Sequence, residues 1–142
     1  MYAARLLLAL ALAANGLAMV FVPAAWYHWV PGVSDTGALN AHFVRDIGCA
    51  YLVAGTAFLW LVRDSRARPA ALASAAFLVL HALLHLAEAA AGGRDLDHLL
   101  ADLPGVFLLP ALALWLAWPR RPLLLQENSN AAMVDEATAR RL

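Results

Sequence analysis

The chain has 142 residues, of which 63% are hydrophobic and only 14% are charged, whereas about 25% of residues are charged in soluble globular domains. A water-soluble fold of this length cannot hide so much apolar surface, so the composition excludes a soluble globular domain. Ten basic residues balance ten acidic ones, which leaves no excess of positive charge for a nucleic-acid partner. All the basic residues are arginine, a usage typical of a GC-rich bacterial genome.

Four apolar stretches predict transmembrane helices, because a hydrocarbon core of about 30 Å needs about 20 helical residues to cross it. The first stretch continues far enough to span, so we expect an uncleaved helix rather than a signal peptide. In the last stretch Pro110 is expected to kink the helix. The sequence therefore predicts an all-α, four-transmembrane-helix bundle in residues 1–121, with helices over residues 4–22, 41–62, 70–91 and 98–118.

The arginines predict the orientation, because short cytoplasmic loops retain positive charge. With four spans, Arg45 and Arg94 lie on one side of the membrane and eight arginines on the other: Arg5, Arg63, Arg66, Arg68, Arg120, Arg121, Arg140 and Arg141. We therefore expect a protein of the bacterial inner (plasma) membrane with both termini in the cytoplasm. Residues 122–142 are expected to form a polar cytoplasmic tail. The outer segment 23–40 carries turn signals and an aromatic cluster, and we expect it to act as a lid.

Polar residues inside the predicted spans are the strongest indication of a functional site, because ionisable groups are costly in a membrane and usually face the bundle interior. They recur at helical spacing on three of the four helices, at similar depths in the outer half of the membrane. Asn15 of the first helix falls at the depth of His81, and we expect the two to form a hydrogen bond. The residues predicted to line a common pocket are Asn15, His42, Arg45, Asp46, Cys49, His81, His85, Glu88 and Asp102.

Imidazole and carboxylate groups at this spacing suit a divalent transition metal. The predicted ligands are His42, Asp46, His85, Glu88, His98 and Asp102, with Cys49 as a further soft ligand. The sequence leaves other interpretations open. One is haem, with His81 or His85 as an axial ligand. Another is a metal-free pocket for a lipid, a quinone or another small apolar molecule. In the last interpretation, the polar side chains only form hydrogen bonds and ion pairs with one another, and Arg45 pairs with Glu88 or Asp102.

The small residues of the first two helices predict close helix packing, since they let two backbones approach each other. These residues are Ala9, Ala13, Gly16, Gly48 and Gly55.

The segment His42-Phe43-Val44-Arg45-Asp46-Ile47-Gly48, which leads into Tyr51 and Gly55, resembles the second helix of the DoxX-like group of small four-helix bacterial membrane proteins. In hydropathy the resemblance extends over residues 3–118. Some members of that group belong to membrane oxidoreductase or redox-homeostasis systems, so the resemblance implies a redox-linked role. It assigns no catalytic residue to this chain.

Three functions are consistent with these patterns, and the sequence does not decide whether the chain is an enzyme. The first is a membrane protein whose outer pocket binds a metal or a small apolar ligand. The second is an accessory or structural subunit of a membrane complex. The third is a small transporter that acts as a homo-oligomer, because four short helices without internal repeats offer little room for a pathway.

Overall fold

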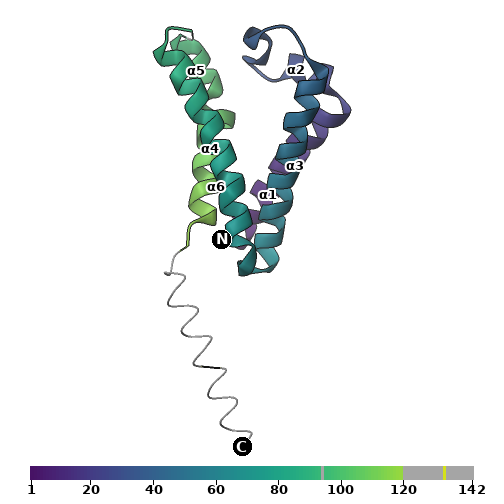
Figure 1. Ribbon diagram of the computed structural model, residues 1–142, viewed down its shortest axis with the longest axis vertical. Helices are drawn as coiled ribbons and strands as arrows, with labels where there is room; N and C mark the ends of the chain where they lie inside the picture. Colours follow the sequence, from purple (N-terminus) through teal and green to yellow (C-terminus); the bar gives the residue numbers. More distant parts are fainter. Residues whose placement is uncertain (94, 120–132, 134–142) are drawn as a thin grey trace, which may run out of the picture.

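The computed structural model describes residues 1–93, 95–119 and 133, and every regular element in this part of the chain is helical. Figure 1 shows two arms that meet at one end and separate at the other. One arm contains α1 and α3, and the other contains α4, α5 and α6. In chain order the elements are α1 (Tyr2–Phe21), α2 (Pro23–Trp29), η1 (Val33–Thr36), α3 (Ala41–Arg63), η2 (Ser65–Ala67), α4 (Arg68–Ala90), α5 (Leu96–Asp102), η3 (Leu103–Leu108) and α6 (Leu109–Ala117).

Four helical stretches are long and apolar enough to cross a membrane: Tyr2–Phe21, Ala41–Arg63, Ser65–Ala90 and Leu96–Ala117. The prediction of an all-α chain with four such helices is therefore confirmed. The third begins before its predicted start, because Pro69 lies in the first turn of α4. A proline is tolerated there, where its missing N–H has no partner to lose.

The fourth span is not one regular α-helix. A π-helical turn, η3, lies between α5 and α6 and ends at Leu108, two residues before Pro110. A proline ring clashes with the carbonyl of the residue four positions earlier, and a wider turn relieves such a clash. The irregularity expected at Pro110 therefore lies in the preceding turn, which Pro104 and Gly105 also help to form.

Glycine contacts hold α1 and α3 together, as the small residues predicted. A Cβ atom added to Gly48 would lie 2.8 Å from Met19 Cβ and 3.0 Å from the Gly16 carbonyl oxygen. A Cβ added to Gly55 would lie 3.0 Å from the backbone of Ala13. The two backbones are therefore in direct contact, and larger residues at these positions would push the helices apart.

The hydrophobic core lies at the end where the arms meet. Its fully buried side chains come from the first half of α1, the second half of α3, the first half of α4 and the end of α6, and include Leu12, Phe58, Leu61, Leu78 and Leu116. Two arginines hold the end of α6 against this core. Arg5 donates to the carbonyl of Leu116 at 3.1 Å, and Arg68 donates to that of Trp118 at 2.9 Å. The bundle is thus closed at one end and open at the other.

Candidate functional site

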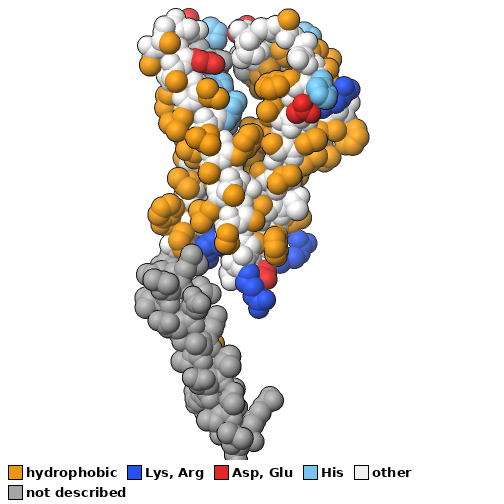
Figure 2. All heavy atoms as spheres, viewed as in Figure 1, with side chains coloured by type: hydrophobic (Ala, Val, Ile, Leu, Met, Phe, Trp, Pro, Cys, Tyr) orange, Lys and Arg blue, Asp and Glu red, His pale blue; other side chains and the backbone are white. Residues whose placement is uncertain are grey.

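A cavity of about 590 Å³ lies between the two arms, at the end away from the core. Its walls are mostly apolar: Ala11 of α1, Ile47 of α3, and Val106 and Leu109 from the fourth span contribute to them. The space-filling view shows the two lobes separated at this end, where acidic and histidine side chains reach the surface (Figure 2). A pocket of this size and lining is typical of sites that bind a small molecule.

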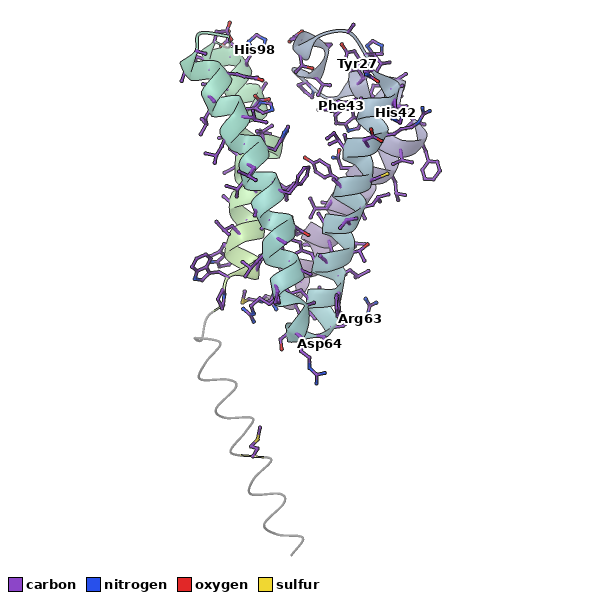
Figure 3. All side chains as sticks on the ribbon, viewed as in Figure 1. Tyr27, His42, Phe43, Arg63, Asp64 and His98 are labelled. Carbon is purple, nitrogen blue, oxygen red and sulfur yellow. The ribbon has the colours of Figure 1, made fainter. Side chains whose placement is uncertain are left out.

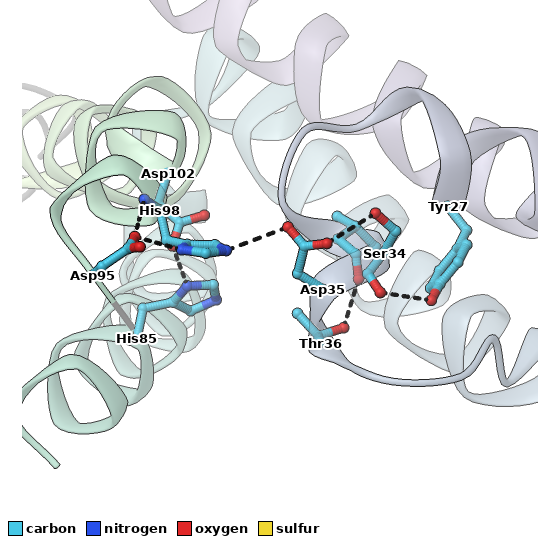
Figure 4. Close-up of polar contacts among 9 residues, drawn as sticks. Tyr27, Ser34, Asp35, Thr36, His85, Asp95, His98 and Asp102 are labelled. Carbon is cyan, nitrogen blue, oxygen red and sulfur yellow. Dashed lines mark hydrogen bonds and ion pairs between the residues drawn. The ribbon is translucent and has the colours of Figure 1, made fainter. Parts of the chain in front are cut away.

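One wall of the cavity carries a buried histidine–aspartate pair. His85 of α4 places its Nδ1 atom 2.7 Å from Oδ2 of Asp102, at the end of α5 (Figure 4). The exposed fractions of these side chains are 13% and 7%. His81, one turn away on α4, contacts the His85 ring edge-on, with the ring centroids 4.7 Å apart. Because buried polar groups are costly without partners, these contacts explain how α4 and α5 keep polar groups in an apolar wall.

The facing wall carries polar groups of a different kind. Asn15 of α1 accepts a hydrogen bond from the Trp26 indole at 2.9 Å, which fastens α2 to α1. Tyr51 of α3 also lines the cavity, and its ring meets Phe77 of α4 edge-on. The cavity thus presents an amide and a phenol opposite the imidazoles of α4.

The segment that includes η1 covers the cavity. Gly32, at its start, has a φ of 78°, and Gly37, at its end, has a φ of 128°, both values that glycine adopts readily. The Tyr27 hydroxyl donates to the carbonyls of Ser34 and Gly37 and so fixes the segment to α2. A Cβ added to Gly32 would lie 3.8 Å from Asp102 Oδ1, so the segment passes over the polar wall.

His98 joins this covering segment to the opposite arm. Its Nδ1 atom lies 2.6 Å from Asp95, the residue that caps the start of α5, and its Nε2 atom lies 3.3 Å from Oδ2 of Asp35 in η1 (Figure 4). The hydrogen bond to the His98 side chain, supported by the one from its backbone N–H, lowers the pKa of Asp95. Asp95 therefore stays ionised beside the ring over the physiological pH range.

The structure brings only part of the predicted pocket together. Asn15, His81, His85 and Asp102 all line the cavity, as the spacing predicted. Asn15 bonds to Trp26, however, rather than to His81. The prediction of an Asn15–His81 hydrogen bond was therefore wrong in its partner, because α2 folds back against α1 and supplies a closer donor.

The polar stripe predicted on the second helix lies on an outward face of α3. His42 and Asp46 contact each other at 3.5 Å with 88% and 59% of their side chains exposed, and Cys49 is exposed as well. His42 and the cavity-lining Phe43 project from different sides of α3 (Figure 3). A helix turns by about 100° per residue, so the face that packs on α1 cannot also carry this stripe.

Arg45 and Glu88 also lie outside the cavity lining. Arg45 donates to the carbonyl of Val20, near the end of α1, at 3.1 Å. The ion pair predicted for Arg45 with Glu88 or Asp102 is thus replaced by a contact that caps a helix end, where cations are favourable. Glu88 is exposed near the end of α4. Arg94, which was predicted to lie on the same side of the membrane as Arg45, and the tail 122–142 (Met133 apart) lie outside the described residues.

The six predicted metal ligands do not converge. Within residues 1–93 and 95–119, no group of three or more His, Cys, Asp or Glu side chains lies close enough to hold a metal ion. Four of the six form two separate pairs, His42 with Asp46 and His85 with Asp102. His98 pairs with Asp95, which was not among the predicted ligands, and Glu88 belongs to none of these pairs. Metal binding therefore stays a prediction without a preformed ligand set among these residues.

Sequence reasoning did not assign Trp26, Tyr27, Tyr51 or Asp35 to the site. Trp26 and Tyr27 belong to the aromatic cluster noted in the outer segment 23–40, and Tyr27 is buried. The sequence contains an indication of their position, because Pro23 starts a new helix directly after α1. That short helix turns both rings inward.

No protein-family model, curated protein or solved structure matches the chain. The resemblance to the DoxX-like group accordingly stays a prediction. The structure alone defines the class, an all-helical chain whose four long apolar helices are compatible with a multi-pass membrane protein.

Proposed function

We propose that the protein is a multi-pass membrane protein that binds a small, largely apolar molecule in the cavity between its two arms. The observation that carries this proposal is the buried His85–Asp102 pair on the wall of an otherwise apolar cavity. A few placed polar groups in a mostly apolar pocket are the usual arrangement for a small-molecule site.

The lining suggests how such a molecule is held. The apolar side chains of α1, α3 and the fourth span contact its body, while His81, His85, Asn15 and Tyr51 offer hydrogen bonds to a polar group. The chemistry fits the metal-free alternative left open by the sequence, a lipid, a quinone or a similar molecule. A redox-linked role, which the DoxX-like resemblance implies, belongs to this proposal when the bound molecule is itself a quinone.

The arginine distribution supports an orientation for the cavity. Arg63, Arg66 and Arg68 lie at the closed end of the bundle, where the basic side chains gather in Figure 2 and where Figure 3 places Arg63. Because positive charge is retained in the cytoplasm, we infer that the closed end is cytoplasmic and the cavity extracytoplasmic, in a bacterial inner membrane.

Filling the cavity tests the proposal. Gly105 lines the cavity and a Cβ added there has no neighbour within 4 Å, so Gly105→Phe adds a ring at the cavity wall without an initial clash. Val53→Phe adds the same ring to an exposed face of α3 and serves as the control. The probe is a decyl-substituted benzoquinone, and its retention on detergent-purified protein is measured by native mass spectrometry.

Gly105→Phe should weaken retention of the probe by about tenfold or more, equivalent to about 1.4 kcal/mol of lost binding free energy. Val53→Phe should retain the probe as the wild type does. Equal retention by all three proteins, or no retention by the wild type, would contradict the proposal.

A further inference from the structure

The segment from Gly32 to Gly37 lies over the cavity and contacts both arms of the molecule. On one side, Tyr27 holds two of its carbonyl groups. On the other, Asp35 reaches across to His98 of α5. The segment thus spans the open end of the bundle, where the helices of the two arms are apart (Figure 1).

Both ends of this segment are glycines, whose backbone can change conformation easily. Gly32 and Gly37 flank the single turn of η1, and both have positive φ angles. Glycine moves between positive and negative φ at little cost, so the turn can shift away from α5 while the Tyr27 hydrogen bonds keep it attached to α2. Gly37 is unobstructed, since a Cβ added there would have no neighbour within 4 Å.

The contacts of His98 depend on its protonation state. Its Nδ1 atom faces the Asp95 carboxylate at 2.6 Å, and its Nε2 atom faces that of Asp35 at 3.3 Å. A neutral imidazole has one N–H group and donates to only one of these carboxylates, whereas an imidazolium donates to both. Bridging Asp95 and Asp35 therefore requires the protonated ring.

The groups around His98 agree with this dependence. Asp95 faces it from its own helix, and Asp35 from η1. His85 of α4 is the next titratable ring in Figure 4, and it is engaged by Asp102. His98 and Asp35 keep 35% and 57% of their side chains exposed, so the pair responds to the pH of the surrounding solution.

We propose that the segment Gly32–Gly37 is a lid over the ligand cavity, latched by the Asp35–His98 contact while His98 is protonated and released when His98 loses its proton. This inference rests on the proposed function, because a lid regulates access only if a molecule enters the cavity. The latch itself, however, is tested without any ligand.

The lid position is measured as the distance between spin labels at Ser34 of η1 and Asp97 of α5, both exposed, in a Cys49→Ser background in lipid nanodiscs. The measurement is made at about pH 5 and about pH 8, on either side of the ordinary titration of imidazole. An exposed ion pair is weak, so we expect the population with the longer, broader distance to rise by about threefold at the higher pH, not completely.

Three variants separate the latch from a general effect of pH. His98→Arg keeps a permanent cation that can bridge both carboxylates, so the short distance should persist at both pH values. Asp35→Asn should abolish the pH response. His42→Gln changes a histidine that pairs only with Asp46 on its own helix and should leave the response intact.

A wild-type distance that is the same at both pH values, or a pH response that survives in Asp35→Asn, would overturn the latch. Those results would leave the probe retention of Gly105→Phe and Val53→Phe unaffected. Conversely, a pH-dependent lid in a protein whose Gly105→Phe variant retains the probe normally would refute the ligand site and leave the latch standing.

Discussion

His85 and His42 each lie beside an aspartate, yet their surroundings differ. The His85–Asp102 pair is almost completely buried, at 2.7 Å, in the wall of the cavity. The His42–Asp46 pair, at 3.5 Å, lies within one helix and is mostly exposed. A hydrogen bond between buried charged or polar groups is costly to break, whereas an exposed pair contributes little. The two pairs therefore offer a matched comparison.

His85→Ala should lower the free energy of unfolding by about 2–4 kcal/mol, because the buried Asp102 carboxyl loses that hydrogen bond and a small void opens beside it. His42→Ala should leave the melting temperature near that of the wild type. Thermal unfolding of the two variants in detergent checks this. Equal melting temperatures for the two variants would mean that the His85–Asp102 pair does not stabilise the bundle.

Residue spacing predicted some members of the site and misplaced others for one physical reason. A stripe at i, i+4 establishes that side chains share a helix face, but not which way that face points. On α4 the stripe of His81 and His85 faces the cavity. On α3 the stripe of His42 and Asp46 faces outward, because Gly48 and Gly55 require the opposite rotation to pack on α1. The metal site predicted from both stripes needed both to point inward.

The packing of α1 against α3 depends on glycines at the contact. Gly48→Leu should separate the two helices, since even a Cβ there would lie 2.8 Å from Met19 Cβ. Overpacking of this kind typically costs about 1–3 kcal/mol. We therefore expect a lower melting temperature for this variant. Gly105→Ala is the control, because the added methyl group enters open space. If Gly48→Leu melts no lower than Gly105→Ala, the helices are not in direct contact at Gly48.

At the level of helices, hydropathy and small residues predicted the four spans and the α1–α3 contact. Neither pattern revealed that the outer segment contains α2 and η1, which are too short for a hydrophobic period to mark. The π-helical turn at Leu103–Leu108 was not predicted either, because it depends on the combined effect of two prolines and a glycine in one helix. Asp35 was therefore recognised only as part of a turn, and its contact with His98 depends on long-range folding.

The whole molecule is divided between a packed end and a hollow end. Leu12, Phe58 and Leu116 fill the space between the arms at one end, and Arg5 and Arg68 cap α6 there. At the other end the cavity takes the place of a core. In the proposed function, the closed half supplies stability while the open half holds the ligand and the lid.

The proposed orientation predicts the location of each end of the bundle. Reporter fusions after Arg68 and after Arg121 should both report the cytoplasm, because the arginines at the closed end are retained there. The opposite control is a cytoplasm-responsive reporter inserted at Gly92, at the open end of the bundle. It should give no signal. A periplasmic signal after Arg68 would invert the bundle and turn the cavity toward the cytoplasm.

The claim that the cavity binds an apolar molecule is tested most directly by photolabelling in native membranes. The probe is an alkyl benzoquinone that carries a diazirine, and labelled peptides are identified by mass spectrometry, with and without an excess of the unlabelled decyl benzoquinone. We predict adducts on the cavity residues Ile47, Tyr51, Val106 and Leu109 that disappear with the competitor. Labelling confined to outward-facing residues such as Val53 and Leu84, unchanged by the competitor, would contradict the proposed ligand site.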